Sequence, residues 1–77
     1  MSEGETQRKP SELFAENVRR ARRRRGLSQE RLAFACRLHR TEISLLERGE
    51  RDPRLSTVVR IARALDCTAS SLLEDVR

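Results

Sequence analysis

Apolar residues recur along this chain at the three- and four-residue spacing of an α-helix, in five short stretches separated by glycine, proline and capping residues. No stretch alternates polar and apolar residues with a period of two, so the pattern predicts no strand. The connections between the stretches are short, as is typical of compact helical domains. The sequence therefore predicts an all-α fold with five helices.

Helix-capping and helix-ending residues give the expected limits of these helices. The first and third helices are expected to end at Gly26 and Gly49, and the second at about Cys36. The fourth is expected over about residues 55–65, and the fifth is short. Ser11, Ser28 and Thr68 are expected to cap the first, second and fifth helices, and the third helix is expected to begin near His39 or Arg40.

A chain of 77 residues forms one domain with a small core. Residues 1–10 are polar and end in proline, so we expect a disordered lead-in there and a folded domain over residues 11–77. The sequence has neither a secretory h-region nor an apolar run long enough to span a membrane. A cytoplasmic protein is therefore expected, with Cys36 and Cys67 as small buried hydrophobes rather than a disulfide.

Charge and composition narrow the class of function. Basic residues outnumber acidic ones by 17 to 12, giving a net charge of +5, and all but one of the basic residues are arginine. The chain has no tryptophan or tyrosine, so it has no aromatic platform for single-stranded nucleic acid. One histidine and two distant cysteines match no metal spacing, and no glycine-rich phosphate loop or paired catalytic acids occur. We therefore expect no enzyme, no metal and no cofactor.

The stretch from Gln29 to Leu46 has the helix-turn-helix pattern, with the small Ala33 where two helices cross. With its flanking residues it resembles the Cro/repressor-type (XRE-type) helix-turn-helix family of DNA-binding proteins. The resemblance covers residues 13–76 and implies a compact five-helix, lambda-repressor-like domain. The residues that carry it are Gly26-Leu27-Ser28-Gln29, Leu32-Ala33, Ile43-Ser44, Leu46-Glu47-Arg48-Gly49, Asp52-Pro53 and Leu65.

This resemblance implies that the third helix lies in the major groove of duplex DNA. Arg40 and Thr41 fall where family members read bases, and Ser44 and Leu45 lie one turn further on. An arginine in that place donates two hydrogen bonds to O6 and N7 of a guanine. Leu45 either touches a thymine methyl group or is simply a surface leucine.

The resemblance also implies a set of backbone contacts and one ion pair. Gln29 falls where the family uses glutamine to hold a phosphate and brace the recognition helix, and His39 either caps that helix or touches a phosphate. In relatives, a basic residue at the position of Arg22 pairs with the glutamate at the position of Glu47. Further phosphate contacts are expected from Ser28, Arg48, Arg51 and Arg54.

The arginine run, the turn before the third helix and an unusual phenylalanine each lead to an expectation. Residues 19–25 contain six arginines, which cannot share one helix face; Arg22 is expected to point inward, and the others either touch phosphates or are solvated. Arg37 stands at a turn position where the family usually has glycine, and a positive φ there costs roughly 1 kcal/mol. Phe34 replaces a residue that is usually polar and exposed, and either packs on the first helix or belongs to a contact surface.

The expected function is that of a transcriptional regulator that binds a palindromic operator as a homodimer, because one small domain makes few base contacts. Leu72, Leu73 and Val76 are expected at the dimer surface, and no small-molecule effector is expected without an effector domain. Size and the third-helix sequence also resemble restriction–modification controller proteins. An antitoxin or adaptor whose partner is a protein is the alternative, and weak salt dependence of DNA binding would favour it.

Overall fold

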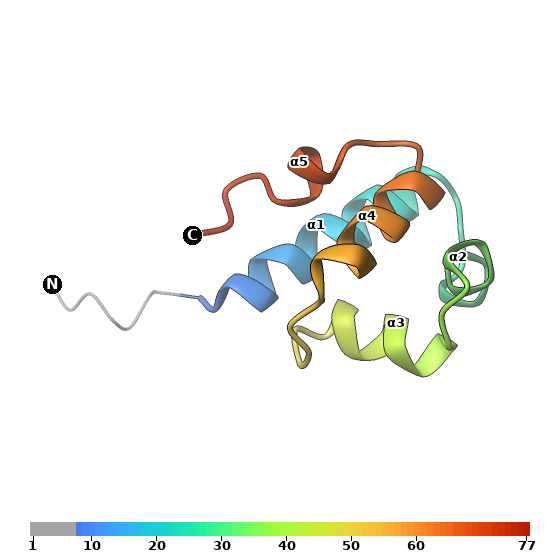
Figure 1. Cartoon of the computed structure of the whole chain (residues 1–77), viewed down its shortest axis with the longest axis horizontal. Helices are drawn as coiled ribbons and strands as arrows, with labels where there is room; N and C mark the ends of the chain where they lie inside the picture. The colour runs from blue at the N-terminus through green and yellow to red at the C-terminus, as the bar shows by residue number, and fades with distance from the viewer. Residues whose placement is uncertain (1–7) are drawn as a thin grey trace, which may run out of the picture.

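Five helices pack around one core in the computed structural model, which describes residues 8–77. Residues 8–77 contain no strand, and the all-α expectation is confirmed. Residues 1–7 lie outside the described residues, so the expected lead-in stays a prediction there. The helices are α1 (Pro10–Arg24), α2 (Gln29–Cys36), α3 (Arg40–Glu47), α4 (Leu55–Ala64) and α5 (Ala69–Leu72) (Figure 1).

The start of α1 differs from the expectation. Lys9, not Ser11, is the N-cap residue, and Pro10 occupies the first helical turn, where its fixed φ and missing N–H suit the helix. The Glu12 carboxylate accepts a hydrogen bond from the Lys9 amide at 3.0 Å and so satisfies one donor at the helix start. The first helix therefore begins at Pro10, before the cap expected at Ser11.

The fifth helix is also shorter than its apolar pattern suggests. Thr68 caps it as expected, with its hydroxyl oxygen accepting from the Ser71 amide at 3.1 Å. The helix ends at Leu72, however, and the chain then turns through Asp75 at φ 63°. The last residues therefore form an irregular segment rather than another helical turn.

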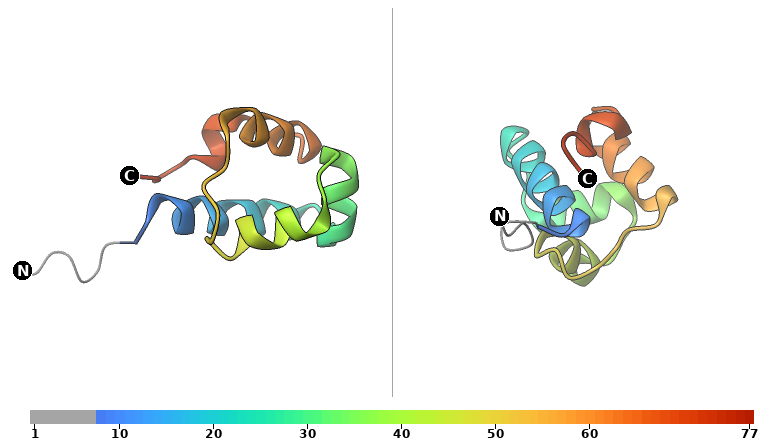
Figure 2. Two further views of the ribbon diagram at one scale, coloured as in Figure 1. Left: turned by 60° about the horizontal axis from the view of Figure 1, so that its bottom comes forward. Right: turned by 90° about the vertical axis from the view of Figure 1, so that its left-hand side faces the viewer.

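All five helices contribute to the core: α1 packs on α3 and α5, and α2 packs on α3 and α4 at one end of the molecule (Figure 2). The helix-turn-helix unit of α2 and α3 covers one side of this core, and α5 closes it between α1 and α4. Each helix thus buries its apolar face and leaves its polar face to solvent. The largest fully buried side chains are Val18, Leu32, Ile43, Leu46, Ile61 and Leu72.

The end of α3 contacts the start of α1 through Gly49. The Ser11 hydroxyl donates to the Gly49 carbonyl at 3.2 Å, and Gly49 has a φ of +72°. A Cβ atom at residue 49 would lie 3.0 Å from Cγ of Glu12 and 3.1 Å from its Cα. Glycine is needed at this position both for the backbone conformation and for the close approach.

Gly49→Ala is expected to destabilise the domain by about 2–3 kcal/mol, because left-handed strain and crowding act together. Gly26→Ala is the matched control, since Gly26 has a similar φ of +70° but a Cβ atom there would have no neighbour within 4 Å. Urea unfolding followed by circular dichroism measures both variants. Equal losses of stability would show that the contact with Glu12 contributes nothing.

Both cysteines are free thiols, as expected. Cys36 is buried and Cys67 is half-buried, so only the first fits the expectation of a core residue fully. Burial raises the pKa of the Cys36 thiol to about 11, against the opposing effect of the nearby Arg60 charge. Within residues 8–77, His, Cys, Asp and Glu side chains form no group of three that could hold a metal ion.

None of the helices over the described residues combines the length and the apolar character that crossing a membrane requires.

Candidate nucleic-acid interface

The outward face of α3 carries the side chains predicted to read bases. Arg40 and Thr41 are exposed in the first turn, and Ser44 and Leu45 are partly exposed one turn later. The opposite face of α3 is buried and carries Ile43, Leu46 and Glu47. The helix therefore presents a mixed donor, acceptor and apolar surface, which is the kind of surface that contacts base edges.

A buried carboxylate fixes the C-terminal end of α3. Glu47 is 2% exposed, and its two oxygens accept from Arg22 Nε at 2.6 Å and Nη2 at 2.9 Å. Gln29 Nε2 donates to the same carboxylate at 3.0 Å, and Arg19 donates to the Glu47 carbonyl. Side chains from α1 and α2 thus converge on one residue of α3, and the ion pair expected from the resemblance is present.

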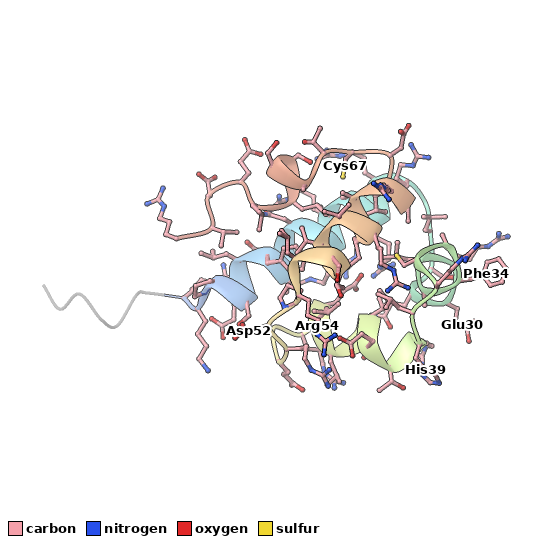
Figure 3. All side chains as sticks on the ribbon, viewed as in Figure 1. Glu30, Phe34, His39, Asp52, Arg54 and Cys67 are labelled. Atoms are coloured by element: carbon pink, nitrogen blue, oxygen red, sulfur yellow. The ribbon has the colours of Figure 1, made fainter. Side chains whose placement is uncertain are left out.

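The starts of α2 and α3 each have a polar cap. The Ser28 hydroxyl oxygen accepts from the Arg31 amide at 3.0 Å. Nδ1 of His39 accepts from the Thr41 amide at 3.1 Å, so His39 caps α3 (Figure 3). Ser28 and His39 are both exposed, and each has hydrogen-bonding capacity left: the O–H of Ser28 and Nε2 of His39 take no part in the caps. Both residues therefore cap a helix, and their contacts with phosphates stay predictions.

Three exposed arginines surround the C-terminal end of α3 and the loop after it. Arg51 pairs with Glu42 at 2.8 Å and Arg48 with Glu50 at 3.3 Å. Arg54 precedes the first residue of α4 and is also exposed (Figure 3). Surface pairs of this kind contribute about 0–1 kcal/mol, so a phosphate can replace the carboxylate partner.

The arginine run over residues 19–25 divides among several partners. Arg22 points inward with 12% of its side chain exposed. Arg20 lies 3.9 Å from Glu16 on the same helix, and Arg25 lies 3.7 Å from Asp66. The run is therefore not a single basic face.

The expected dimer surface needs one correction. Leu72 is 1% exposed and belongs to the core of the single chain, so it has no surface to offer a second copy. Leu73 is 41% exposed and Val76 is partly exposed. Nδ2 of Asn17 donates to the carbonyls of Leu72 at 2.8 Å and Glu74 at 3.0 Å, and so holds this segment against α1.

Phe34 does not pack on the first helix. It is 87% exposed on α2, at the end of the molecule opposite to the start of α1 and the C-terminus (Figure 3). The second alternative, that Phe34 belongs to a contact surface, stays a prediction.

Sequence reasoning missed two arginines that bind backbone carbonyls. Arg19 contacts the end of α3, and Arg60 of α4 contacts the end of α2. The acceptors are main-chain oxygens, which carry no sequence signal. Arg60 lies 24 residues from its acceptor, so no local pattern connects the two.

Comparison with known proteins agrees with this geometry. The family model HTH_3, a helix-turn-helix family, matches residues 18–72. Control protein C.SmaI of Serratia marcescens is 48% identical over 62 residues, which cover 80% of this chain and 74% of that protein. Control protein C.BamHI of Bacillus amyloliquefaciens is 44% identical over 63 residues, covering 80% of this chain and 78% of that protein.

A solved structure shares the fold over most of its length. The restriction-modification controller protein C.AhdI from Aeromonas hydrophila superposes with a TM-score of 0.79 at 37% identity, covering 80% of this chain and 94% of that one. The regulator ClgR from Corynebacterium glutamicum gives a TM-score of 0.81 at 25% identity, covering 83% of this chain and 68% of that one. The arrangement of helices is thus common to helix-turn-helix regulators.

Proposed function

We propose that this chain, which belongs to the helix-turn-helix family of transcriptional regulators, binds a palindromic operator in duplex DNA as a homodimer. In this proposal α3 lies in the major groove. Arg40, Thr41, Ser44 and Leu45 contact bases there. One observation carries the proposal: an outward polar face on a helix whose C-terminal end is fixed by the buried Glu47 carboxylate.

Phosphate contacts on both sides of α3 set its depth and register in the groove. The amide N–H groups at the start of α2, beside Ser28 and Gln29, are suited to one phosphate. Gln29 donates to Glu47 through one N–H, which leaves its second N–H for the DNA backbone. The remaining proposed phosphate contacts are His39, Arg48, Arg51 and Arg54.

The dimer forms through the C-terminal segment in this proposal. Leu73 and Val76 border a shallow groove whose apolar walls include Pro10, Phe14 and Pro53. A second copy that covers this groove removes exposed apolar surface from water. Two copies of charge +5 carry +10 together, which accelerates encounter with DNA.

Selection of bound duplexes from a random pool tests the proposal. An enriched inverted repeat is expected, with half-sites about 34 Å apart, and two chains per duplex by sedimentation. Affinity is expected to fall steeply as the salt concentration rises. The slope of log affinity against log salt concentration is expected to be about −0.9 for each phosphate contact. A tight protein partner together with weak, salt-insensitive DNA binding would instead favour the antitoxin or adaptor function.

Leu73→Asp is expected to weaken dimerisation and, through it, operator binding. A carboxylate buried at an apolar interface without a partner opposes association strongly. We expect at least a tenfold rise in the dimer dissociation constant, measured by sedimentation equilibrium. Leu55→Asp is the matched control, because Leu55 is 75% exposed at the start of α4 and lies outside the groove. If the two variants dimerise equally well, the C-terminal segment is not the interface.

A restriction–modification controller is the more specific form of this function. The names of two curated relatives and one structural neighbour favour it, since all three are control or controller proteins. Such a regulator acts where the DNA is, which in bacteria is the cytoplasm. The test is whether the selected operator lies upstream of this chain's own reading frame and a neighbouring restriction endonuclease frame. An operator absent from both places would contradict the controller role.

A further inference from the structure

The turn between α2 and α3 has an arginine, Arg37, in a backbone conformation that usually requires glycine. Arg37 adopts the left-handed conformation at φ 60° and ψ 41°, which glycine adopts more readily. The Leu38 amide donates back to the Ala33 carbonyl at 2.9 Å, so the turn closes as a Schellman motif. The carbonyls of Cys36 and Arg37 are then left without partners from the helix or the turn.

Arg60 of α4 binds both of these carbonyls. Its Nε and Nη2 atoms donate to the Cys36 carbonyl at 3.0 and 2.8 Å. Nη2 also donates to the Arg37 carbonyl at 2.8 Å. The guanidinium therefore places a full positive charge at the negative end of the α2 dipole and spans two successive carbonyls.

This contact lies immediately before the recognition helix. His39 caps α3 and Arg40 is its first residue, three positions after Arg37. Arg22 and Gln29 hold the other end of α3 through Glu47, and Arg60 holds the turn just before its first residue. Movement of the turn shifts the N-terminal end of α3, which carries Arg40 and Thr41, two of the proposed base-contacting residues.

We propose that Arg60 is a positioning residue for DNA recognition: it clamps the α2–α3 turn to α4 and thereby sets the placement of Arg40 and Thr41. The inference rests on the proposed function. Arg60 itself makes no base contact in this proposal. It acts through the carbonyls of Cys36 and Arg37, and a lysine cannot reproduce its two-pronged geometry.

The test compares Arg60→Met with Arg63→Met, which removes the same charge from an exposed arginine three residues along α4. Each variant is titrated with the selected operator and with an unrelated duplex, at a temperature where both are folded. Arg60→Met is expected to bind the operator about tenfold more weakly than Arg63→Met, with equal affinity for the unrelated duplex. Arg60→Lys is expected to recover only part of the loss. Should Arg60→Met fail to fold, Arg60→Lys and Arg63→Lys provide the same comparison.

Two further readouts separate the possible failures. The slope of log operator affinity against log salt concentration is expected to be equal for the Arg60 and Arg63 variants. A slope shallower by about 0.9 for the Arg60 variant would show that Arg60 contacts a phosphate, and would overturn the positioning role. Equal operator affinity of the two variants would also overturn it. Amide exchange of Leu38 and Glu42 in the free protein is expected to be about tenfold faster in Arg60→Met. The exchange measurement tests the contact between Arg60 and the turn without DNA. If the wild-type protein prefers no duplex, the proposed function fails, and the exchange rates still show whether Arg60 holds the turn.

Discussion

Glu47→Ala is expected to destabilise the domain by about 3–5 kcal/mol, the largest loss expected from any single polar substitution in the described structure. The substitution leaves the mostly buried Arg22 guanidinium without its carboxylate and frees the Gln29 amide. It also removes the side-chain bonds from Arg22 and Gln29 to the C-terminal end of α3, and leaves only the main-chain contact with Arg19 at residue 47. Urea unfolding measures the loss, and operator binding is expected to be lost with it.

The control for this effect is Glu50→Ala. Glu50 also pairs with an arginine, Arg48, but both side chains are more than half exposed. Exposed pairs contribute about 0–1 kcal/mol, so a change within that range is expected. The double variant Arg22→Met with Glu47→Leu is expected to regain most of the stability, because no unpaired charge is then buried. Similar losses for Glu47→Ala and Glu50→Ala would show that the buried network does not hold α3.

Arg40→Ala is expected to cost about 1–3 kcal/mol of discrimination at one guanine of each half-site. An arginine in the first turn of α3 forms two hydrogen bonds with O6 and N7 of guanine, and alanine forms neither. The measurement is operator affinity for the wild-type half-site and for half-sites with each other base at that position. Wild-type protein should discriminate among them, and the variant should not.

Arg51→Ala provides the contrast. Arg51 is exposed, pairs with Glu42, and is proposed to contact a phosphate. Its removal is expected to weaken binding to all sequences alike and to lower the salt slope by about 1. If Arg40→Ala gives this uniform pattern instead, Arg40 contacts the backbone and does not read a base.

Sequence reasoning predicted the parts of the fold that depend on local signals. These signals connect residues that are only a few positions apart in the sequence. They include the caps at Ser28 and Thr68, the glycine after α1 and the apolar faces of the helices, and the structure has them where they were expected. The Arg22–Glu47 pair is not local, and it was predictable only because the resemblance supplies both positions. Arg37 likewise has the positive φ that its place in the turn implies.

The errors have physical causes that a single sequence hides. Pro10 and Ser11 both suit a helix start, and the long-range bond from Ser11 to Gly49 favours the earlier start. Leu72 and Leu73 are adjacent and equally apolar, so only the tertiary fold decides which is buried. Arg60 resembles any surface arginine, because its partners are carbonyl oxygens in a turn far away in the sequence.

Dimethyl sulfate footprinting on the selected operator tests the central claim most directly, because the reagent methylates guanine N7 in the major groove and adenine N3 in the minor groove. If α3 of each subunit reads the major groove, the wild-type protein protects guanines at two symmetry-related positions about one helical turn apart. The Arg40→Ala variant, at a concentration that saturates the site, leaves those guanines reactive. Protection of adenine N3 alone, or a single unsymmetric protected site, would contradict major-groove recognition by a homodimer.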